Sequence, residues 1–192
     1  MGARSEGGSR GDTSTHGLRT PLEGRPIAPW SDDQPIAAPM QLIRPTVPAE
    51  WVDYNGHMSE SCYLVAFGDQ SDALFRLIGI GEDYRAGGHS LFTVQTMMFN
   101  LAEAHLGDEL MLTLHLLDAD EKRLHLFHSM ANAATGELLA TAEQMLVHVD
   151  LRAGRSVPMP PPVLHKVMAI REAHCDLPKP AQAGRKIGLG RN

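Results

Sequence analysis

One helical segment followed by four alternating segments is the pattern that most constrains the fold of this chain. Hydrophobic residues recur with helical spacing up to Ile78, and from there on with a period of two, as in half-buried strands. The alternating segments span residues 91–101, 109–117, 123–131 and 138–150. The turns between them are short, as antiparallel neighbours require. The pattern predicts an α+β fold in which an antiparallel sheet wraps around one long central helix.

The predicted central helix begins between residues 59 and 61 and presents one apolar face. That face is formed by Leu64, Phe67, Ser71, Leu74, Phe75 and Ile78. Ala66 and Ala73 keep its other sides small, and Gly79 with Gly81 is a typical helix stop. Two shorter elements are expected around this core. One is a short first strand or a sheet edge over residues 41–47, which alternate around two prolines, and the other is an amphipathic helix over residues 163–173.

Length and composition predict a single domain with two tails. With 192 residues and 43% hydrophobic content, the chain can bury one substantial core, which we place at residues 39–175. Residues 1–38 are rich in Gly, Arg, Ser, Thr, Asp and Pro, and residues 176–192 are rich in Pro, Gly, Lys and Arg. We expect a disordered N-terminal tail and a flexible C-terminal tail, because such segments bury too little apolar surface to offset the entropy of ordering.

Charge and hydropathy argue against several classes of protein. The net charge of −6 and the pI of about 5.9 give no general attraction to nucleic acid or to an anionic membrane. The sequence lacks the roughly 18 consecutive apolar residues of a membrane span, and its N-terminus lacks the apolar core of a secretory signal. Cys62 and Cys175 stand far apart without metal-type spacing. We therefore expect a cytoplasmic protein without a disulfide or a zinc site.

The strongest indication of chemistry is the segment Trp51-Val52-Asp53-Tyr54-Asn55-Gly56-His57-Met58. It places a carboxylate, a flexible turn and an imidazole directly before the predicted start of the helix. A helix start offers unpaired backbone N–H groups and the positive end of the helix dipole. These groups can polarise a substrate carbonyl while Asp53 attacks it or activates water. The segment therefore predicts an acyl-transfer site.

The same residues resemble a known family. Asp53-x-x-Gly56-His57, followed by Tyr63, is similar to the D-x-x-G-H-x-N-N-x-x-Y signature of the 4-hydroxybenzoyl-CoA thioesterase-like branch of the hotdog superfamily. The likeness continues to about Val149. Ser59 and Glu60 replace the paired asparagines of the signature, so any role of those amides does not carry over.

Within that branch, the runs 53–73 and 120–128 look most like the thioesterases of carnitine degradation, which act on betainyl-CoA and are sometimes fused to carnitine dehydrogenase. The resemblance implies a hotdog fold and an acyl-CoA thioesterase that hydrolyses betainyl-CoA to glycine betaine and CoA. It implies no metal and no redox cofactor. The alternatives within the same fold are a thioesterase for another short or aromatic acyl group, and a non-enzymatic module that only binds acyl-CoA.

Each residue of the motif has a catalytic and a structural interpretation. Asp53 is the expected catalytic carboxylate, either as a nucleophile or as a general base toward water, although an aspartate here can also simply cap a turn. Asn55 either orients the substrate or serves the turn. Gly56 permits a backbone angle or a close approach that a Cβ would obstruct. For His57 we favour a structural role, in which its hydrogen bonds hold the loop, over proton transfer.

The resemblance also assigns the oxyanion donors. It implies that a backbone N–H among Ser59, Glu60 and Ser61 faces the thioester oxygen. The side chains of Ser59 and Glu60 have a plainer expected role at the helix start, where they cap the helix and complement its dipole.

Aromatic residues are concentrated around the motif, namely Trp51, Tyr54, Tyr63 and Phe67. Ordinary packing between helix and sheet is the favoured interpretation for Tyr63 and Phe67. A quaternary ammonium group, however, is characteristically held by aromatic faces. Together with the resemblance, this makes Trp51 and Tyr54 candidates for an acyl pocket suited to betaine, and Tyr63 and Gly56 further candidates for substrate binding.

Other reaction classes fit the sequence less well. The hydratase branch of the fold uses a D-x-N-P-x-H pattern, which the segment from Asp53 to His57 lacks. The serine-hydrolase motif G-x-S-x-G is also missing around Ser90. His115, His125 and His128 are spread over two predicted strands, with the last two on opposite faces, so they do not form a convincing metal site.

The resemblance finally implies an assembly. Hotdog sheets join edge to edge in a two-fold homodimer, which can pair further into a dimer of dimers, with each active site at the subunit boundary. Contacts to CoA then come in part from the second chain. The cationic residues available for its phosphates are Arg85, Lys122, Arg123, Arg152 and Arg155.

Overall fold

The computed structural model describes residues 29–189, so most of the predicted N-terminal tail lies outside the described residues. Its elements are the 3₁₀ turn η1 (Ala49–Trp51), helices α1 (Glu60–Ile78), α2 (Glu82–Ala86) and α3 (Pro161–His174), and strands β1 (His89–Asn100), β2 (Leu110–Ala119), β3 (Arg123–Asn132), β4 (Leu138–Asp150) and β5 (Arg155–Ser156). The predicted central helix, the four long strands and the last helix are confirmed, with ends that differ from the predicted ones by at most two residues.

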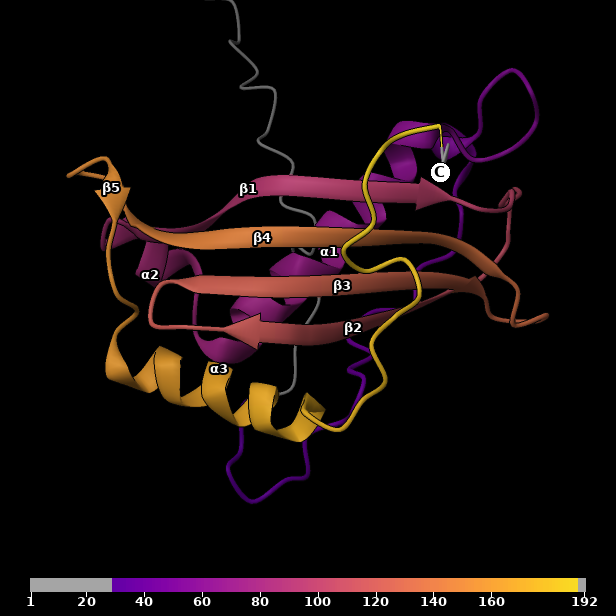
Figure 1. Ribbon diagram of the computed structural model, residues 1–192. Helices are drawn as coiled ribbons and strands as arrows, with labels where there is room; N and C mark the ends of the chain where they lie inside the picture. Colours follow the sequence, from indigo (N-terminus) through magenta and orange to yellow (C-terminus); the bar gives the residue numbers. More distant parts are fainter. Residues whose placement is uncertain (1–28, 190–192) are drawn as a thin grey trace, which may run out of the picture.

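The four long strands form one antiparallel sheet in the order β1-β4-β3-β2, and β5 adds a short pairing to β4. Helix α1 lies across one face of this sheet, and α3 lies beside β2 (Figure 1). This is the predicted hotdog arrangement. It leaves β1 as an outer strand with β4 as its partner in the sheet.

Residues 41–47 do not form the predicted strand. The chain touches the outer edge of β2 at isolated points, where Met40 pairs with Leu114 and Thr46 with Glu109. Met40 and Leu114 exchange both backbone hydrogen bonds, at 2.9 and 2.7 Å. Pro45 has no N–H to donate, so a continuous ladder cannot form here. Its carbonyl still accepts from Leu110 N–H at 2.8 Å, which keeps this segment attached to the edge.

The core lies between α1 and the sheet. Phe67, Leu74 and Ile78 are fully buried, as the helical pattern predicts, but Leu64 on the same predicted face is 42% exposed. Leu64 lies in the second turn of α1, directly after Tyr63, which lines the cavity described below. Gly79 ends the helix in the left-handed conformation, with φ of 99°. A following hydrogen bond from Ile80 N–H to Phe75 O (2.7 Å) completes the turn.

A buried polar group interrupts this apolar core. His128 of β3 is fully buried, and its Nε2 lies 3.3 Å from Ser71 Oγ on α1. The same hydroxyl lies 3.4 Å from Gln144 Oε1 on β4, and Gln144 Nε2 donates to Thr96 of β1 at 3.3 Å. Burial lowers the pKa of His128 from 6.5 to about 4. The imidazole is therefore neutral in the folded protein at neutral pH.

This burial predicts a loss of stability in acid. The pKa of His128 is lower in the folded than in the unfolded chain, so the unfolded chain binds the proton first as the pH falls from about 6.5 towards 4. The stabilisation by neutral His128 is complete above that window and is lost within it. Between pH 7 and pH 4.5 we expect this residue alone to lower the free energy of unfolding by about 2 kcal/mol.

Urea unfolding at the two pH values, at one fixed protein concentration, measures the effect. His128→Gln keeps a polar side chain that does not titrate, so its stability should change less with pH than that of the parent. Buried His174 also has a lowered pKa, but it is present in both proteins and cancels from the comparison. An equal loss of stability in parent and variant would contradict the assignment.

Candidate active site

The motif folds into a tight turn between two paired residues. Val52 pairs with Met58, and Asp53 N–H donates to His57 O at 3.0 Å. Within the turn, Gly56 N–H donates to Asp53 O at 3.0 Å, and Asn55 N–H donates to the Asp53 carboxylate at 2.7 Å. Gly56 has a φ of 85°, which residues with a Cβ rarely adopt. Gly56 thus supplies the backbone angle that the turn needs, whereas Asn55 contributes its backbone N–H to the turn.

Two further hydrogen bonds fix this turn to the rest of the domain. Met58 is buried, and its N–H donates to Ala104 O in the loop after β1 at 2.7 Å. Ser59 N–H donates to Trp51 O in η1 at 2.8 Å. The Asp53 turn is thus held against both η1 and the loop after β1.

The start of α1 has fewer unpaired backbone N–H groups than the three that the sequence predicts. Ser59 is the N-cap residue, without a side-chain capping bond, and its N–H is already engaged by Trp51 O. Glu60 and Ser61 are the first two residues of the helix, whose N–H groups have no acceptor within a helix. They find no backbone acceptor among the described residues either. Of the three predicted oxyanion donors, Glu60 and Ser61 therefore remain available.

Tyr63 fixes the loop that follows β1. Its side chain is buried, and its hydroxyl accepts from Ala104 N–H at 3.0 Å and donates to Ala102 O at 3.3 Å. Burial raises the pKa of Tyr63, which keeps the hydroxyl protonated as a donor. No local sequence pattern predicts this hydrogen-bonding role, because the two partners lie about forty residues away along the chain.

A cavity of about 300 Å³ opens beside the turn. It is lined by His57, Met58, Glu60, Tyr63, Asn100, Leu101, Ala102 and Glu103. His57 Nδ1 lies 3.5 Å from Met58 O, and His57 Nε2 lies 3.6 Å from a carboxylate oxygen of Glu103. The structure thus brings together three of the predicted site residues, His57, Glu60 and Tyr63. It adds residues 100–103, which carry no recognisable motif in the sequence.

Other predicted site residues lie outside the cavity lining. Asp53 is half-buried at the start of the turn, and Tyr54 is 97% exposed because it occupies the turn itself. Trp51 packs partly against the core around Phe67. Trp51 and Tyr54 therefore do not form an aromatic pocket together with this cavity in the protomer.

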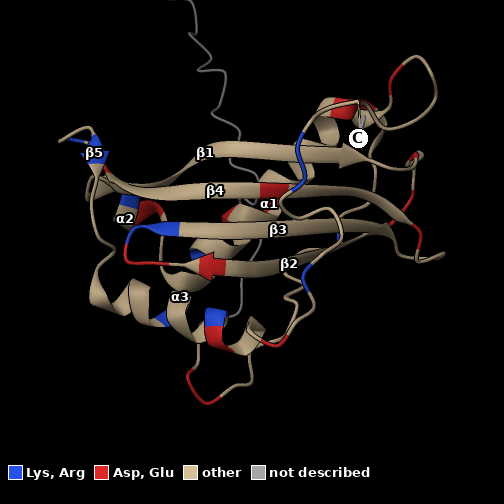
Figure 2. Cartoon of the chain, viewed as in Figure 1, with Lys and Arg blue, Asp and Glu red and all other residues tan. Residues whose placement is uncertain are grey.

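Charge is distributed unevenly over the domain. The cavity contains two carboxylates, and none of its lining residues is Lys or Arg. One group of cations lies at the opposite end of β1, where β5 carries Arg155 (Figure 2) and the Arg152 side chain packs beside Gly88. A second group lies on the C-terminal segment, where Arg185 and Lys186 line a cavity together with Gln95 and Met97 of β1. Gly88 directly precedes β1, so the cationic end and the cavity are separated by the length of that strand.

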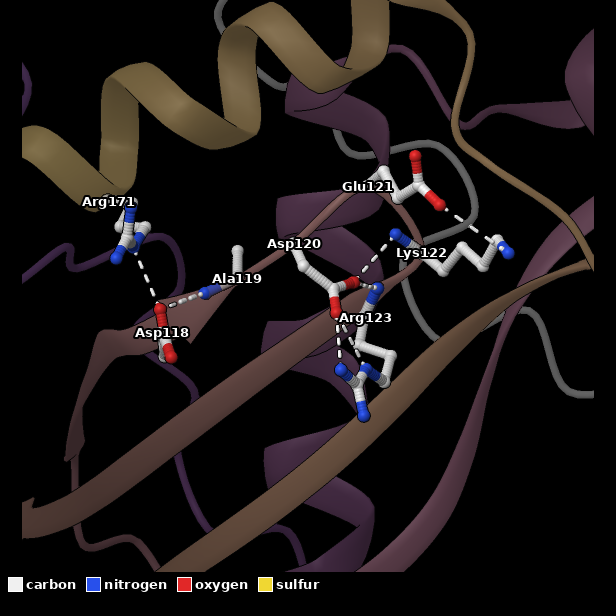
Figure 3. Close-up of polar contacts among 7 residues, drawn as sticks. All are labelled: Asp118, Ala119, Asp120, Glu121, Lys122, Arg123 and Arg171. Carbon is white, nitrogen blue, oxygen red and sulfur yellow. Dashed lines mark hydrogen bonds and ion pairs between the residues drawn. The ribbon is translucent and has the colours of Figure 1, made fainter.

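Of the remaining predicted phosphate contacts, Arg85 lies on α2. Lys122 and Arg123 lie at the β2–β3 turn, where both form ion pairs with acidic residues of the same turn (Figure 3). Asp120 accepts from Arg123 Nε at 2.8 Å, and Arg123 holds the pKa of that carboxyl below its usual value. Lys122 lies 3.5 Å from Glu121, and Arg171 of α3 donates to Asp118 at 2.8 Å. These pairs hold the hairpin together and attach it to α3, so Lys122 and Arg123 are poor candidates for binding a ligand.

His125 and His128 of β3 lie on opposite faces of the sheet, as predicted, whereas His115 and His125 line the same cavity on the outer face. His128 faces α1, whereas His125 lies on the outer face, where its Nε2 is 2.7 Å from Glu143. His115 contacts the ring of His174 instead. The outer face is also crossed by the C-terminal segment, where Gly184 N–H donates to Glu143 at 2.6 Å (Figure 1).

Comparison with known proteins agrees with the fold and the motif. Residues 47–167 match the family described as the thioesterase-like superfamily, and this range contains the Asp53 turn, α1 and the whole sheet. The L-carnitine dehydrogenase/betainyl-CoA thioesterase of Rhizobium meliloti (strain 1021) is 50% identical over 155 residues, which are 81% of this chain and 31% of that protein. This chain thus spans about a third of the length of that relative.

A shorter relative is covered almost completely. The betainyl-CoA thioesterase of Pseudomonas aeruginosa is 44% identical over 146 residues, which are 76% of this chain and 91% of that protein. Among solved structures, the protein SAV2348 of Staphylococcus aureus in complex with CoA superposes with a TM-score of 0.71 at 28% identity, over 80% of this chain and 98% of that one. The family match, the relatives and the geometry agree that this chain belongs to the thioesterase-like superfamily.

Proposed function

We propose that this protein is an acyl-CoA thioesterase that hydrolyses betainyl-CoA to glycine betaine and free CoA. The observation that carries the proposal is the Asp53 turn, which lies directly before the first turn of α1 with its two unpaired backbone N–H groups. His57 of this turn and Glu60 of the helix line the same cavity. Two relatives at 44% and 50% identity are named betainyl-CoA thioesterases. The CoA complex of a structural neighbour supports acyl-CoA as the ligand class.

In the proposed reaction, the N–H groups of Glu60 and Ser61 polarise the thioester carbonyl. Asp53 either removes a proton from the attacking water or attacks the carbonyl carbon itself. In the first route, the tetrahedral intermediate collapses to the carboxylic acid and the CoA thiolate, which takes up the proton. In the second route, a mixed anhydride forms with release of the thiolate, and water then hydrolyses the anhydride. His57 holds the turn through its contacts with Met58 and Glu103.

The proposed active unit is a homodimer joined through β1. This strand is twelve residues long, forms an edge of the sheet, and exposes Phe92 and Val94 by 51% and 60%. Edges of this kind favour pairing with another strand. If β1 pairs with its own copy about a two-fold axis, the start of one strand lies beside the end of the other. The cationic end with Arg152 then approaches the partner's cavity, where it supplies the contacts that CoA phosphates need.

A panel of acyl-CoA substrates tests the proposed function. Purified protein should release free thiol from betainyl-CoA with a kcat/KM well above that for acetyl-CoA, which lacks the cationic group. Equal rates on betainyl-CoA and on neutral short or aromatic acyl-CoAs would remove the betaine assignment and leave a general thioesterase. Binding of all acyl-CoAs without release of thiol would instead indicate a non-enzymatic acyl-CoA-binding module.

A further inference from the structure

We propose that Glu103 is the residue that selects a cationic acyl group in this site, with Glu60 in a supporting role. This inference rests on the proposed thioesterase function and adds the physical basis of its substrate preference. It places recognition of the quaternary ammonium group in the cavity beside α1, at a carboxylate, and not at the aromatic pair Trp51 and Tyr54.

The first support is the composition of the cavity. Glu60 of α1 and Glu103 of the loop after β1 both line it. Met58, Tyr63, Leu101 and Ala102 add apolar or aromatic surface, and His57 and Asn100 are the other polar lining residues. Neither Lys nor Arg is among its lining residues. A cationic group bound in the cavity is therefore attracted by the carboxylates of Glu60 and Glu103 and can contact the ring of Tyr63, whereas an anionic group would be repelled.

The second support is the way in which Glu103 is held. The Tyr63 hydroxyl donates to Ala102 O and accepts from Ala104 N–H, so the residues on both sides of Glu103 are fixed to the same buried side chain. Burial is the main cause of the raised pKa of Tyr63, and the negative charge of Glu103 raises it further. The Glu103 side chain is 63% exposed, but the main chain on both sides of it is held in the cavity wall by these two hydrogen bonds of Tyr63.

The third support comes from the chemistry of the acyl group. A trimethylammonium group has no N–H, so it cannot form conventional hydrogen bonds and must be recognised by charge and by aromatic faces. Tyr54 is almost fully exposed, and neither Tyr54 nor Trp51 lines the cavity. The imidazoles nearest to Glu103 are those of His57 at 3.6 Å and His105 at 4.0 Å, and they compete for its charge only when protonated.

The test compares two substrates that differ only in charge. One is betainyl-CoA, and the other is 3,3-dimethylbutanoyl-CoA, in which carbon replaces the quaternary nitrogen. A cation about 4 Å from a carboxylate in water-like surroundings gains about 1 kcal/mol, which corresponds to roughly a fivefold effect. In Glu103→Gln, the ratio of kcat/KM for betainyl-CoA to that for the neutral analogue should therefore fall about fivefold. Glu103→Asp should keep most of the ratio, because it keeps the charge.

Glu172→Gln is the matched control, because it removes one exposed carboxylate from α3, which packs against β2 on the side of the sheet away from β1. Its ratio should equal that of the parent. A second readout needs no variant. The preference of the parent for betainyl-CoA should decrease with ionic strength, because salt screens an exposed carboxylate.

The outcomes separate this inference from the proposed function. Hydrolysis of betainyl-CoA with a ratio that is unchanged in Glu103→Gln and independent of salt would overturn the role of Glu103 and leave the thioesterase proposal intact. Hydrolysis of neutral acyl-CoAs alone would overturn the cation selectivity as a whole. A fall in the ratio for Glu103→Gln but not for Glu172→Gln is the result that we expect.

Discussion

Asp53→Asn should lower kcat for acyl-CoA hydrolysis by a factor of roughly 100 or more, the usual scale for loss of a catalytic acid or base. Asparagine has the same shape as aspartate, and its side-chain oxygen can still accept from Asn55 N–H, the bond that closes the turn. The fold should therefore be preserved while the carboxylate is lost. Steady-state kinetics with a free-thiol assay measures the effect, and thermal unfolding checks that the variant is folded.

Glu50→Gln is the control for this experiment. Glu50 is an exposed carboxylate in η1, three residues before Asp53, and it does not line the cavity. Its removal changes the net charge by the same amount and should leave kcat close to that of the parent. Turnover by folded Asp53→Asn within about threefold of the parent would exclude Asp53 from the chemistry.

Val94→Lys should convert the protein from a dimer to a monomer and abolish most of its activity. Val94 lies at the bulge in the middle of β1, is 60% exposed, and would face its own copy across a two-fold axis. Charged residues on an edge strand oppose pairing, and two lysines in such a contact would also repel each other. Because the proposed CoA contacts come from the partner, we expect activity to fall on the order of a hundredfold, as for a misplaced substrate.

Light scattering provides the measurement, with an expected change from twice the chain mass to the single-chain mass of 20.9 kDa. Val94→Thr is the matched control, because it keeps the branched shape and introduces no charge, so it should remain dimeric and active. A parent protein that is monomeric at micromolar concentration and fully active would contradict the dimer proposal.

The fold could be predicted from the sequence because its main elements are defined by local patterns. The strand β4 matches its predicted limits, and the end of α1 coincides with Gly79, since alternation and a glycine stop are visible within a few residues. A strand over residues 41–47 was predicted wrongly because their hydrophobic alternation is the same as that of a true edge strand. Only the position of Pro45 against β2 determines that pairing stops there.

The candidate site could be predicted only in part, for a related reason. Asp53, Asn55 and Gly56 act within one turn, so their arrangement follows from neighbouring residues. The loop with Glu103 joins the site through Tyr63, across about forty residues, and no local pattern indicates that contact. Tyr54 lies within the motif but is 97% exposed, because it occupies the tip of the tight turn that Asp53 and Gly56 close.

The hydrolysis of betainyl-CoA itself tests the central claim most directly. Purified protein is incubated with betainyl-CoA, and free CoA thiol and glycine betaine are both quantified, with Asp53→Asn as the comparison. The proposed function predicts that the parent releases the two products in equal amounts and that Asp53→Asn releases both far more slowly. Unchanged betainyl-CoA after incubation with folded parent protein would contradict it.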